Sequence, residues 1–202
     1  MLDKYGTGQD PYCIPGTSIL SNRLGLTSDE ALTEAERSLS AIAANEIDFE
    51  PPPYNLSYLC GIHRQLFRDI YHWAGELRTV DISKGMTHFC NVLRIEPEAN
   101  KLFRILADTN WFERLSRREL VAAAATLFGD LNMIHPFREG NGRAQRILFE
   151  HIVINAGYEI SWWAVEEGEW VQANIEAVTC DYRAMTEIFE RCIGEAIFLG
   201  EP

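Results

Sequence analysis

Basic side chains are scarce in this sequence. Its 202 residues include 18 Lys and Arg against 30 Asp and Glu, which gives a formal net charge of −12 at pH 7. A surface that binds nucleic acid needs a basic footprint, so the composition argues against direct binding of nucleic acid. A small anion pocket is still compatible with an acidic protein, because the positive field of such a pocket is local.

Long apolar runs and cysteine pairs are missing as well. No run approaches the roughly eighteen apolar residues of a membrane span, and the N-terminus lacks a basic stretch followed by an apolar core. The cysteines are scattered and contain no C-x-x-C pair: Cys13, Cys60, Cys90, Cys180 and Cys192. We therefore expect a cytoplasmic protein with reduced thiols, and no membrane segment, disulfide framework or zinc site.

Apolar residues recur at helical spacing over most of the chain. The length suits one domain. We expect residues 1–202 to form a single all-α domain, with an irregular segment over residues 1–26 and a core over about 27–198. About seven helices are predicted. After a first one near residue 30, they cover residues 55–74, 96–107, 120–134, 147–156, 167–179 and 182–197.

Two capping boxes mark predicted helix starts, because a hydroxyl and a carboxylate three residues apart can satisfy free N–H groups there. Ser116 and Glu119 precede the alanine-rich helix over residues 120–134. Thr27 and Glu30 precede an apolar stripe. Its members are Leu32, Ala35, Leu39 and Ile42.

One stretch, residues 77–92, has β character. Apolar residues flank the segment Ser83-Lys84-Gly85-Met86-Thr87. This pattern predicts a short hairpin with a glycine-containing turn. It is the only convincing β pattern in the sequence.

The segment over residues 135–146, H-P-F-R-E-G-N-G-R-A-Q-R, lies between two predicted buried helices. Pro136 disfavours helical geometry at His135, so the preceding helix should end there. Phe137 is expected to anchor the segment in the core. Gly140-Asn141-Gly142 are residue types that readily take positive φ. A sharp turn into a helix points several N–H groups at one spot, which predicts an anion site.

Charged side chains complete this predicted site. Arg143 and Arg146 share one face of the new helix and, with the amide donors, suit a polyphosphate. Glu139 would repel such a ligand unless it held a divalent cation, most often Mg²⁺. His135 is a suitable base for an attacking hydroxyl. A glycine-rich turn with a satisfied histidine and solvated charges is the alternative, but so many such residues within twelve positions favour the site.

The segment resembles the signature of the Fic family, H-x-F-x-[D/E]-G-N-G-R-x-x-R, with every fixed position filled. The order of elements from about residue 5 to residue 198 also resembles the short bacterial Fic toxins of toxin–antitoxin pairs. The resemblance implies an all-helical Fic fold and a protein adenylyltransferase, which moves AMP from ATP to a Tyr, Ser or Thr hydroxyl of a target protein.

The resemblance also implies roles for the segment. Gly140, Asn141 and Gly142 would hold the α- and β-phosphates of ATP, with Asn141 donating to the α-phosphate. The two arginines would orient the β- and γ-phosphates. The histidine would deprotonate the target hydroxyl, and the glutamate would hold Mg²⁺ together with phosphate oxygens.

By the same resemblance, the predicted hairpin is the flap that docks an extended target segment by strand addition. The flap would comprise Met86, Thr87, His88, Phe89 and Cys90. From the residues alone, an ordinary hairpin that covers the core is equally compatible.

Fic proteins are often inhibited by a helix with the pattern [S/T]-x-x-x-E-[G/N], whose Glu pairs with the second motif arginine, here Arg146. The nearest match, residues 186–191, ends in Arg191, and its Glu190 would be an atypical internal inhibitor. We expect no inhibitory helix in this chain. The resemblance then implies a separate small antitoxin that targets Arg146.

The resemblance suggests type II topoisomerase subunits, such as DNA gyrase B or a topoisomerase IV subunit, as targets. Three alternatives remain open. The same fold could transfer UMP or a phosphoryl group, or remove AMP. The chain could be an inactive nucleotide-binding module. It could also be a helical assembly protein with an incidental motif, which predicts no ATP binding.

Overall fold

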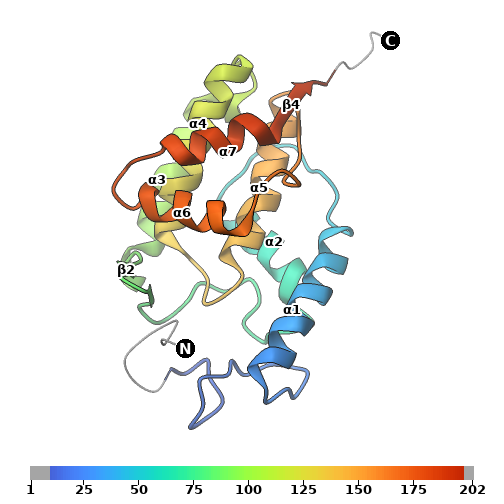
Figure 1. The fold of residues 1–202 in the computed structure, drawn as a ribbon, viewed down its shortest axis with the longest axis vertical. Helices are drawn as coiled ribbons and strands as arrows, with labels where there is room; N and C mark the ends of the chain where they lie inside the picture. Colours follow the sequence, from blue (N-terminus) through green and yellow to red (C-terminus); the bar gives the residue numbers. More distant parts are fainter. Residues whose placement is uncertain (1–9, 198–202) are drawn as a thin grey trace.

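The computed structural model describes residues 10–197, and seven α-helices build the fold in this range (Figure 1). The helices are α1 Asp29–Ala44, α2 Leu56–Phe67, α3 Ile95–Asp108, α4 Arg117–Ile134, α5 Asn141–Asn155, α6 Glu167–Ala177 and α7 Arg183–Cys192. The short 3-10 helices η1 Val92–Arg94 and η2 Asn110–Phe112 flank α3. The predicted all-α class is confirmed. Residues 1–9 of the predicted irregular segment, and residue 198 of the predicted core, lie outside the described residues.

Helices α4 and α5 lie at the centre of the core. Leu148, Phe149 and Ile152 of α5 are fully buried, and α5 packs against both α2 and α4. Figure 1 shows α6 and α7 on one side of α5, while α1 lies beside α2 on another. The loop that joins α4 to α5 packs against α2, where the His63 ring contacts the Phe137 ring.

The capping box at Ser116 is confirmed. Ser116 Oγ accepts from the Glu119 N–H (3.4 Å), and the Glu119 carboxylate accepts from the Ser116 N–H (2.9 Å). The box at Thr27 is wrong. The cap of α1 is Ser28, which accepts from the Ala31 N–H (3.4 Å), so Thr27 lies one residue before the cap position.

The inward face of α1 differs from the predicted apolar stripe. Leu32 is buried, but Ile42 is 59% exposed. The inward face instead carries Glu36 and Ser40, which follow Leu32 at intervals of four residues and so share its side of the helix. Two polar side chains thus enter the interior of the protein from α1.

The second predicted helix, over residues 55–74, is too long, because α2 ends at Phe67. The chain then turns, and the N–H groups of Ile70 and Tyr71 both donate to the Phe67 carbonyl (2.9 Å each). Gly75 has φ +82°, and a Cβ there would lie 2.7 Å from the Arg64 Cβ. Only glycine allows this close return of the chain to α2.

The hairpin consists of β1 Ser83–Lys84 and β2 Thr87–His88, paired antiparallel around Gly85. A second small sheet was missed. It pairs β3 Tyr158–Ile160 with β4 Ile193–Ala196, so the predicted helix over residues 182–197 is wrong after Cys192. Gly194 is a poor helix former, and it packs closely on Glu159 of β3, which favours the strand.

The remaining predicted helices agree with α3, α4, α5 and α6 within a few residues, except that α5 begins earlier, at Asn141. Among residues 10–197, no helix has both the length and the apolar character that a membrane span requires.

Candidate active site

The loop between α4 and α5 begins at His135, where α4 ends as predicted. His135 takes the left-handed conformation (φ +47°), which is uncommon for a residue other than glycine. Its carbonyl accepts from Arg78 Nε (2.8 Å), and the Pro136 carbonyl accepts from the Arg78 N–H (2.9 Å). Buried Arg78 therefore fixes the backbone at the point where the helix stops.

Phe137 anchors the loop in the core, as predicted. Its ring is fully buried and stacks on His63 with 3.9 Å between ring centroids. Asn141 Oδ1 accepts from the Phe137 N–H (2.9 Å), and Asn141 Nδ2 donates to the Phe137 carbonyl (2.8 Å). These bonds leave one Nδ2 hydrogen of Asn141 for another acceptor.

Only one residue of the Gly140-Asn141-Gly142 segment has positive φ. Gly140 has φ +78°, and a Cβ there would lie 2.4 Å from the Phe67 ring. Asn141 and Gly142 are helical, because α5 already begins at Asn141. The expectation that the sharp turn would extend over all three residues is wrong.

The start of α5 is nonetheless suited to an anion. It has no side-chain cap, so the amides of its first turn lack the acceptor that a Ser, Thr or Asp would supply. A Cβ on Gly142 would meet nothing within 4 Å, so the space beside this turn is open. The helix dipole and these amides favour a negative group in that space.

The two arginines of α5 have different surroundings. Arg143 is held by Glu36 of α1, with 2.6 Å between Nη2 and Oε2, and its guanidinium lies over the Phe67 ring. Arg146 has no carboxylate within ion-pair distance among residues 10–197. Burial, and then the nearby Arg143, lower the pKa of Arg146 from its usual value. Glu150 acts against this shift, but no carboxylate among residues 10–197 lies within ion-pair distance of Arg146. A half-buried cation without such a pair favours an anionic ligand.

Glu139 is a loop residue that lies beside Arg143. Its Oε1 accepts from the Gly140 N–H (3.0 Å) and lies 3.9 Å from Arg143 Nη2. No group of three or more metal-ligating side chains occurs among residues 10–197. A single carboxylate suits Mg²⁺ when phosphate oxygens and water complete the coordination, so Glu139 fits that cation in the presence of a nucleotide.

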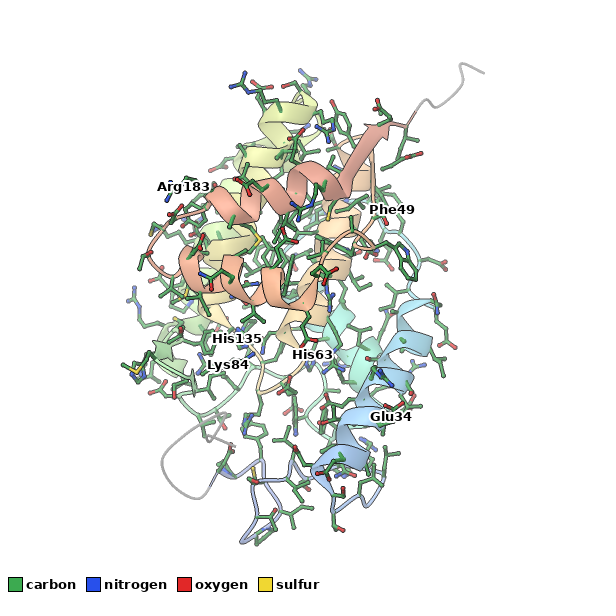
Figure 2. All side chains as sticks on the ribbon, viewed as in Figure 1. Glu34, Phe49, His63, Lys84, His135 and Arg183 are labelled. Atoms are coloured by element: carbon green, nitrogen blue, oxygen red, sulfur yellow. The ribbon has the colours of Figure 1, made fainter. Side chains whose placement is uncertain are left out.

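The ring of His135 is oriented to accept a proton. Its Nδ1 lies 3.1 Å from the Asn132 carbonyl, which only accepts, so Nδ1 carries the hydrogen and Nε2 is free to accept. The ring stacks on Phe89, next to β2, with 3.8 Å between centroids. Figure 2 shows His135 close to Lys84 of the hairpin, and Lys84 also acts electrostatically on the His135 ring.

Burial lowers the pKa of His135 to about 4, against the opposing effect of the Asn132 carbonyl. We therefore expect the ring to remain neutral as pH falls from 7 to about 5, and to gain its proton only as pH approaches 4. An NMR titration of the ring, assigned with a His135→Asn variant, measures this directly. Protonation near pH 6.5, the value of an exposed histidine, would contradict the buried geometry.

The predicted flap residues lie beside this ring. Phe89 faces His135, whereas Met86 at the turn is 95% exposed and His88 is also exposed. Cys90 connects the hairpin to α4, because its N–H donates to the Met133 carbonyl (3.0 Å). The hairpin thus covers the histidine and presents its turn to solvent.

Residues of the loop, α5, α1 and the hairpin border one cleft of about 1740 Å³. The cleft includes Glu139, Arg143, Arg146 and Lys84, and it extends to the N-terminal segment at Asp10. This volume exceeds the 300–1,000 Å³ typical of small-ligand pockets. The cleft can therefore hold a nucleotide, whereas His135 and the predicted flap residues 86–90 are not among the residues that line it.

Comparison with known proteins identifies the family. Residues 53–153 match the model of the Fic/DOC family. The chain belongs to this family. A relative from Salmonella typhimurium, named "Probable protein adenylyltransferase Fic", is 41% identical over 196 residues, which cover 97% of this chain and 98% of the relative.

Solved Fic structures have the same fold. The N-terminal Fic domain of a Bep effector protein from Bartonella quintana, solved with bound ADP, has a TM-score of 0.85 and 29% identity over 92% of this chain and 95% of that one. The BepC protein from Bartonella tribocorum, solved with bound AMPPNP, has a TM-score of 0.83 and 29% identity over 90% of this chain and 95% of that one. The predicted Fic fold is confirmed.

The structure places Glu190 away from the Fic arginines. Its carboxylate pairs with Arg117 at the start of α4, and not with Arg146. The predicted helix around it is α7, which packs on α4 and α6. Glu190 therefore does not act as an internal inhibitor of Arg146 in this structure.

Several supporting residues of the Fic site were missed in the sequence. Arg78, Glu36 and Asp10 lie far from the motif along the chain, yet each bonds to it. His63 of α2 is fully buried beneath the loop. Its Nδ1 accepts from the Gly75 N–H (2.8 Å), so Nε2 donates to the Glu139 carbonyl (3.0 Å) and supports the loop.

Proposed function

We propose that this chain transfers AMP from ATP to a Tyr, Ser or Thr hydroxyl of a target protein, and that it is the toxin of a toxin–antitoxin pair. One observation carries the proposal. His135 begins the loop that leads to the uncapped start of α5, which bears Arg143 and Arg146. Among residues 10–197, Nε2 of His135 has no hydrogen-bond partner and Arg146 has no ion pair. A base and a polyphosphate cradle thus border the same loop.

The chain is a protein adenylyltransferase, since a relative that matches it along nearly the whole of both sequences bears that name. Nucleotide binding has structural support, because the similar Fic proteins from two Bartonella species were solved with ADP and with AMPPNP. ATP is therefore the expected AMP donor.

The chemistry follows from the positions of the side chains. His135 Nε2 would accept the proton of the target hydroxyl, whose oxygen attacks the α-phosphorus. The bond from the α-phosphorus to the bridging oxygen breaks, and pyrophosphate leaves. Gly142 and the first-turn amides of α5 would receive phosphate oxygens, and the remaining Nδ2 hydrogen of Asn141 would donate to the α-phosphate.

The charged side chains would stabilise the departing pyrophosphate. Arg143 and Arg146 would orient the β- and γ-phosphates. Glu139 would hold Mg²⁺, which supplies positive charge to the phosphate oxygens when bound. Most of the rate enhancement would come from placement and charge stabilisation.

The hairpin would select the target. Residues 86–90 would pair with an extended target segment, so that backbone bonds give affinity and neighbouring side chains give specificity. Phe89 already contacts the histidine ring, so a segment docked on the hairpin would bring its hydroxyl to the base.

A small antitoxin would control the enzyme in the cytoplasm. Arg146 has no ion pair among residues 10–197, and no residue pattern of this chain fits the inhibitory helix. A carboxylate of the antitoxin would therefore pair with Arg146. DNA gyrase B and the topoisomerase IV subunit are the targets that we propose to test first.

The test uses purified gyrase B and topoisomerase IV subunits with the protein, Mg²⁺ and ATP. We expect the intact mass of one subunit to rise by one AMP residue, on a peptide that carries a Tyr, Ser or Thr. A mass increase from UTP but not from ATP would favour UMP transfer. Binding of ATP without modification of any protein in a bacterial lysate would favour the inactive nucleotide-binding module.

A further inference from the structure

A carboxylate from α1 reaches the phosphate cradle. Glu36 Oε2 lies 2.6 Å from Arg143 Nη2, and the Glu36 side chain is 12% exposed. The two residues are 107 positions apart in the chain. An ion pair at this distance and depth is a specific contact, unlike the solvated pairs of the surface.

The same guanidinium is held on two further sides. Arg143 Nη1 lies 3.2 Å from Ser40 Oγ, and the Phe67 ring centroid lies 4.6 Å from the guanidinium carbon. Glu36 is in turn fixed by Tyr71, whose hydroxyl donates to the other carboxylate oxygen. Side chains from α1 and α2 therefore hold one arginine in a single orientation, and Tyr71 fixes the carboxylate that they include.

We propose that Glu36 is a positioning residue, which orients Arg143 for a polyphosphate. This inference rests on the proposed function, because it assigns a role within the same site. A free Arg side chain carries considerable rotamer entropy, which a ligand must otherwise remove on binding. Fixing the side chain beforehand lowers that cost. The guanidinium of Arg143 has five N–H donors, so donors remain for phosphate after the bonds to Glu36 and Ser40 are made.

Charge alone predicts the opposite effect, since a carboxylate repels a polyphosphate. The charge of Glu36, however, is compensated at short range by Arg143 and by the Tyr71 hydroxyl. The pair therefore acts on a phosphate as a dipole, and its positive end, the guanidinium of Arg143, is carried by α5 and so lies on the side of the cradle. The loss of orientation acts directly on the arginine that binds the ligand, so positioning outweighs repulsion.

The test compares the binding of AMPPNP with Mg²⁺ to variants of the full chain by calorimetry. We expect Glu36→Ala to raise Kd about three- to tenfold, the effect of releasing one long side chain. Glu36→Gln retains an acceptor and should raise Kd less. The control Glu34→Ala lies on the same helix, in an exposed ion pair with Arg37, and should leave Kd unchanged.

A double-variant cycle shows whether Glu36 acts through Arg143. On an Arg143→Ala background, Glu36→Ala should cause no further loss. In AMP transfer, Glu36→Ala should raise KM for ATP and leave kcat nearly unchanged. If Glu36→Ala does not fold, Tyr71→Phe and Glu36→Gln take its place, since both weaken the contacts that hold Arg143 through Glu36.

Binding by Glu36→Ala that is as tight as in the wild type, or tighter, would overturn the inference, and so would full additivity with Arg143→Ala. A different result would contradict the proposed function. A wild-type protein that binds AMPPNP but transfers no AMP would contradict the proposed function, and the Kd comparison would still decide the role of Glu36.

Discussion

Replacing His135 with Ala is expected to reduce AMP transfer by a factor of about 10²–10⁴, the usual contribution of a general base. The Nε2 of this ring is its free acceptor, because Nδ1 is bonded to the Asn132 carbonyl. The nucleotide cradle lies on α5 and does not depend on the ring, so the Kd for ATP should remain nearly the same. Initial rates of target modification and calorimetric ATP binding measure the two effects.

Two controls separate chemistry from backbone strain. His135→Asn tolerates the left-handed backbone better than Ala does, and should be equally inactive. His72→Ala removes an exposed histidine and should retain activity. Transfer by His135→Ala within threefold of the wild type would show that another group takes the proton.

Substitution by alanine is expected to have opposite effects on stability at the two glycines of the motif, Gly140 and Gly142. Gly140→Ala places a Cβ 2.4 Å from the Phe67 ring at φ +78°. Left-handed strain and overpacking together should lower the free energy of unfolding by about 2–5 kcal/mol. Gly142→Ala meets nothing within 4 Å and has helical geometry, so stability should stay the same or rise by about 0.5–1 kcal/mol.

For ATP binding, in contrast to stability, we expect a loss from Gly142→Ala. The Gly142→Ala methyl group would enter the open space beside the first turn of α5, so this stable variant should bind ATP more weakly than the wild type. Urea unfolding and calorimetry on both variants provide the comparison. A Gly142→Ala variant that binds ATP normally would show that the phosphates do not approach this turn.

The motif loop could be predicted from the sequence because its determinants lie close together in the chain. Pro136 stops a helix, Gly140 permits the turn, and Phe137 is an aromatic residue in an otherwise polar segment, so local chemistry sufficed. The extent of the turn could not be predicted. Gly142 is helical, since glycine permits positive φ without requiring it.

The residues that contact the motif from distant parts of the chain could not be predicted, for a different reason. Glu36 and Ser40 share the inward face of α1 with Leu32, but polar side chains at that spacing are typical of a solvated face, so the sequence does not mark them as buried. Arg78 lies in a stretch with β character, and nothing local shows that its guanidinium donates to the His135 carbonyl. β4 could form only because β3 lies beside it.

The most direct test of AMP transfer incubates the protein with Mg²⁺, bacterial lysate and ATP labelled at the α-phosphate, with γ-labelled ATP and His135→Ala in parallel. The arrangement of base and cradle predicts a target band labelled only from the α-position and absent with the variant. Label from the γ-position alone would make the protein a phosphoryl-transfer enzyme and contradict the proposed chemistry. Equal α-label with wild type and His135→Ala would remove His135 from the reaction.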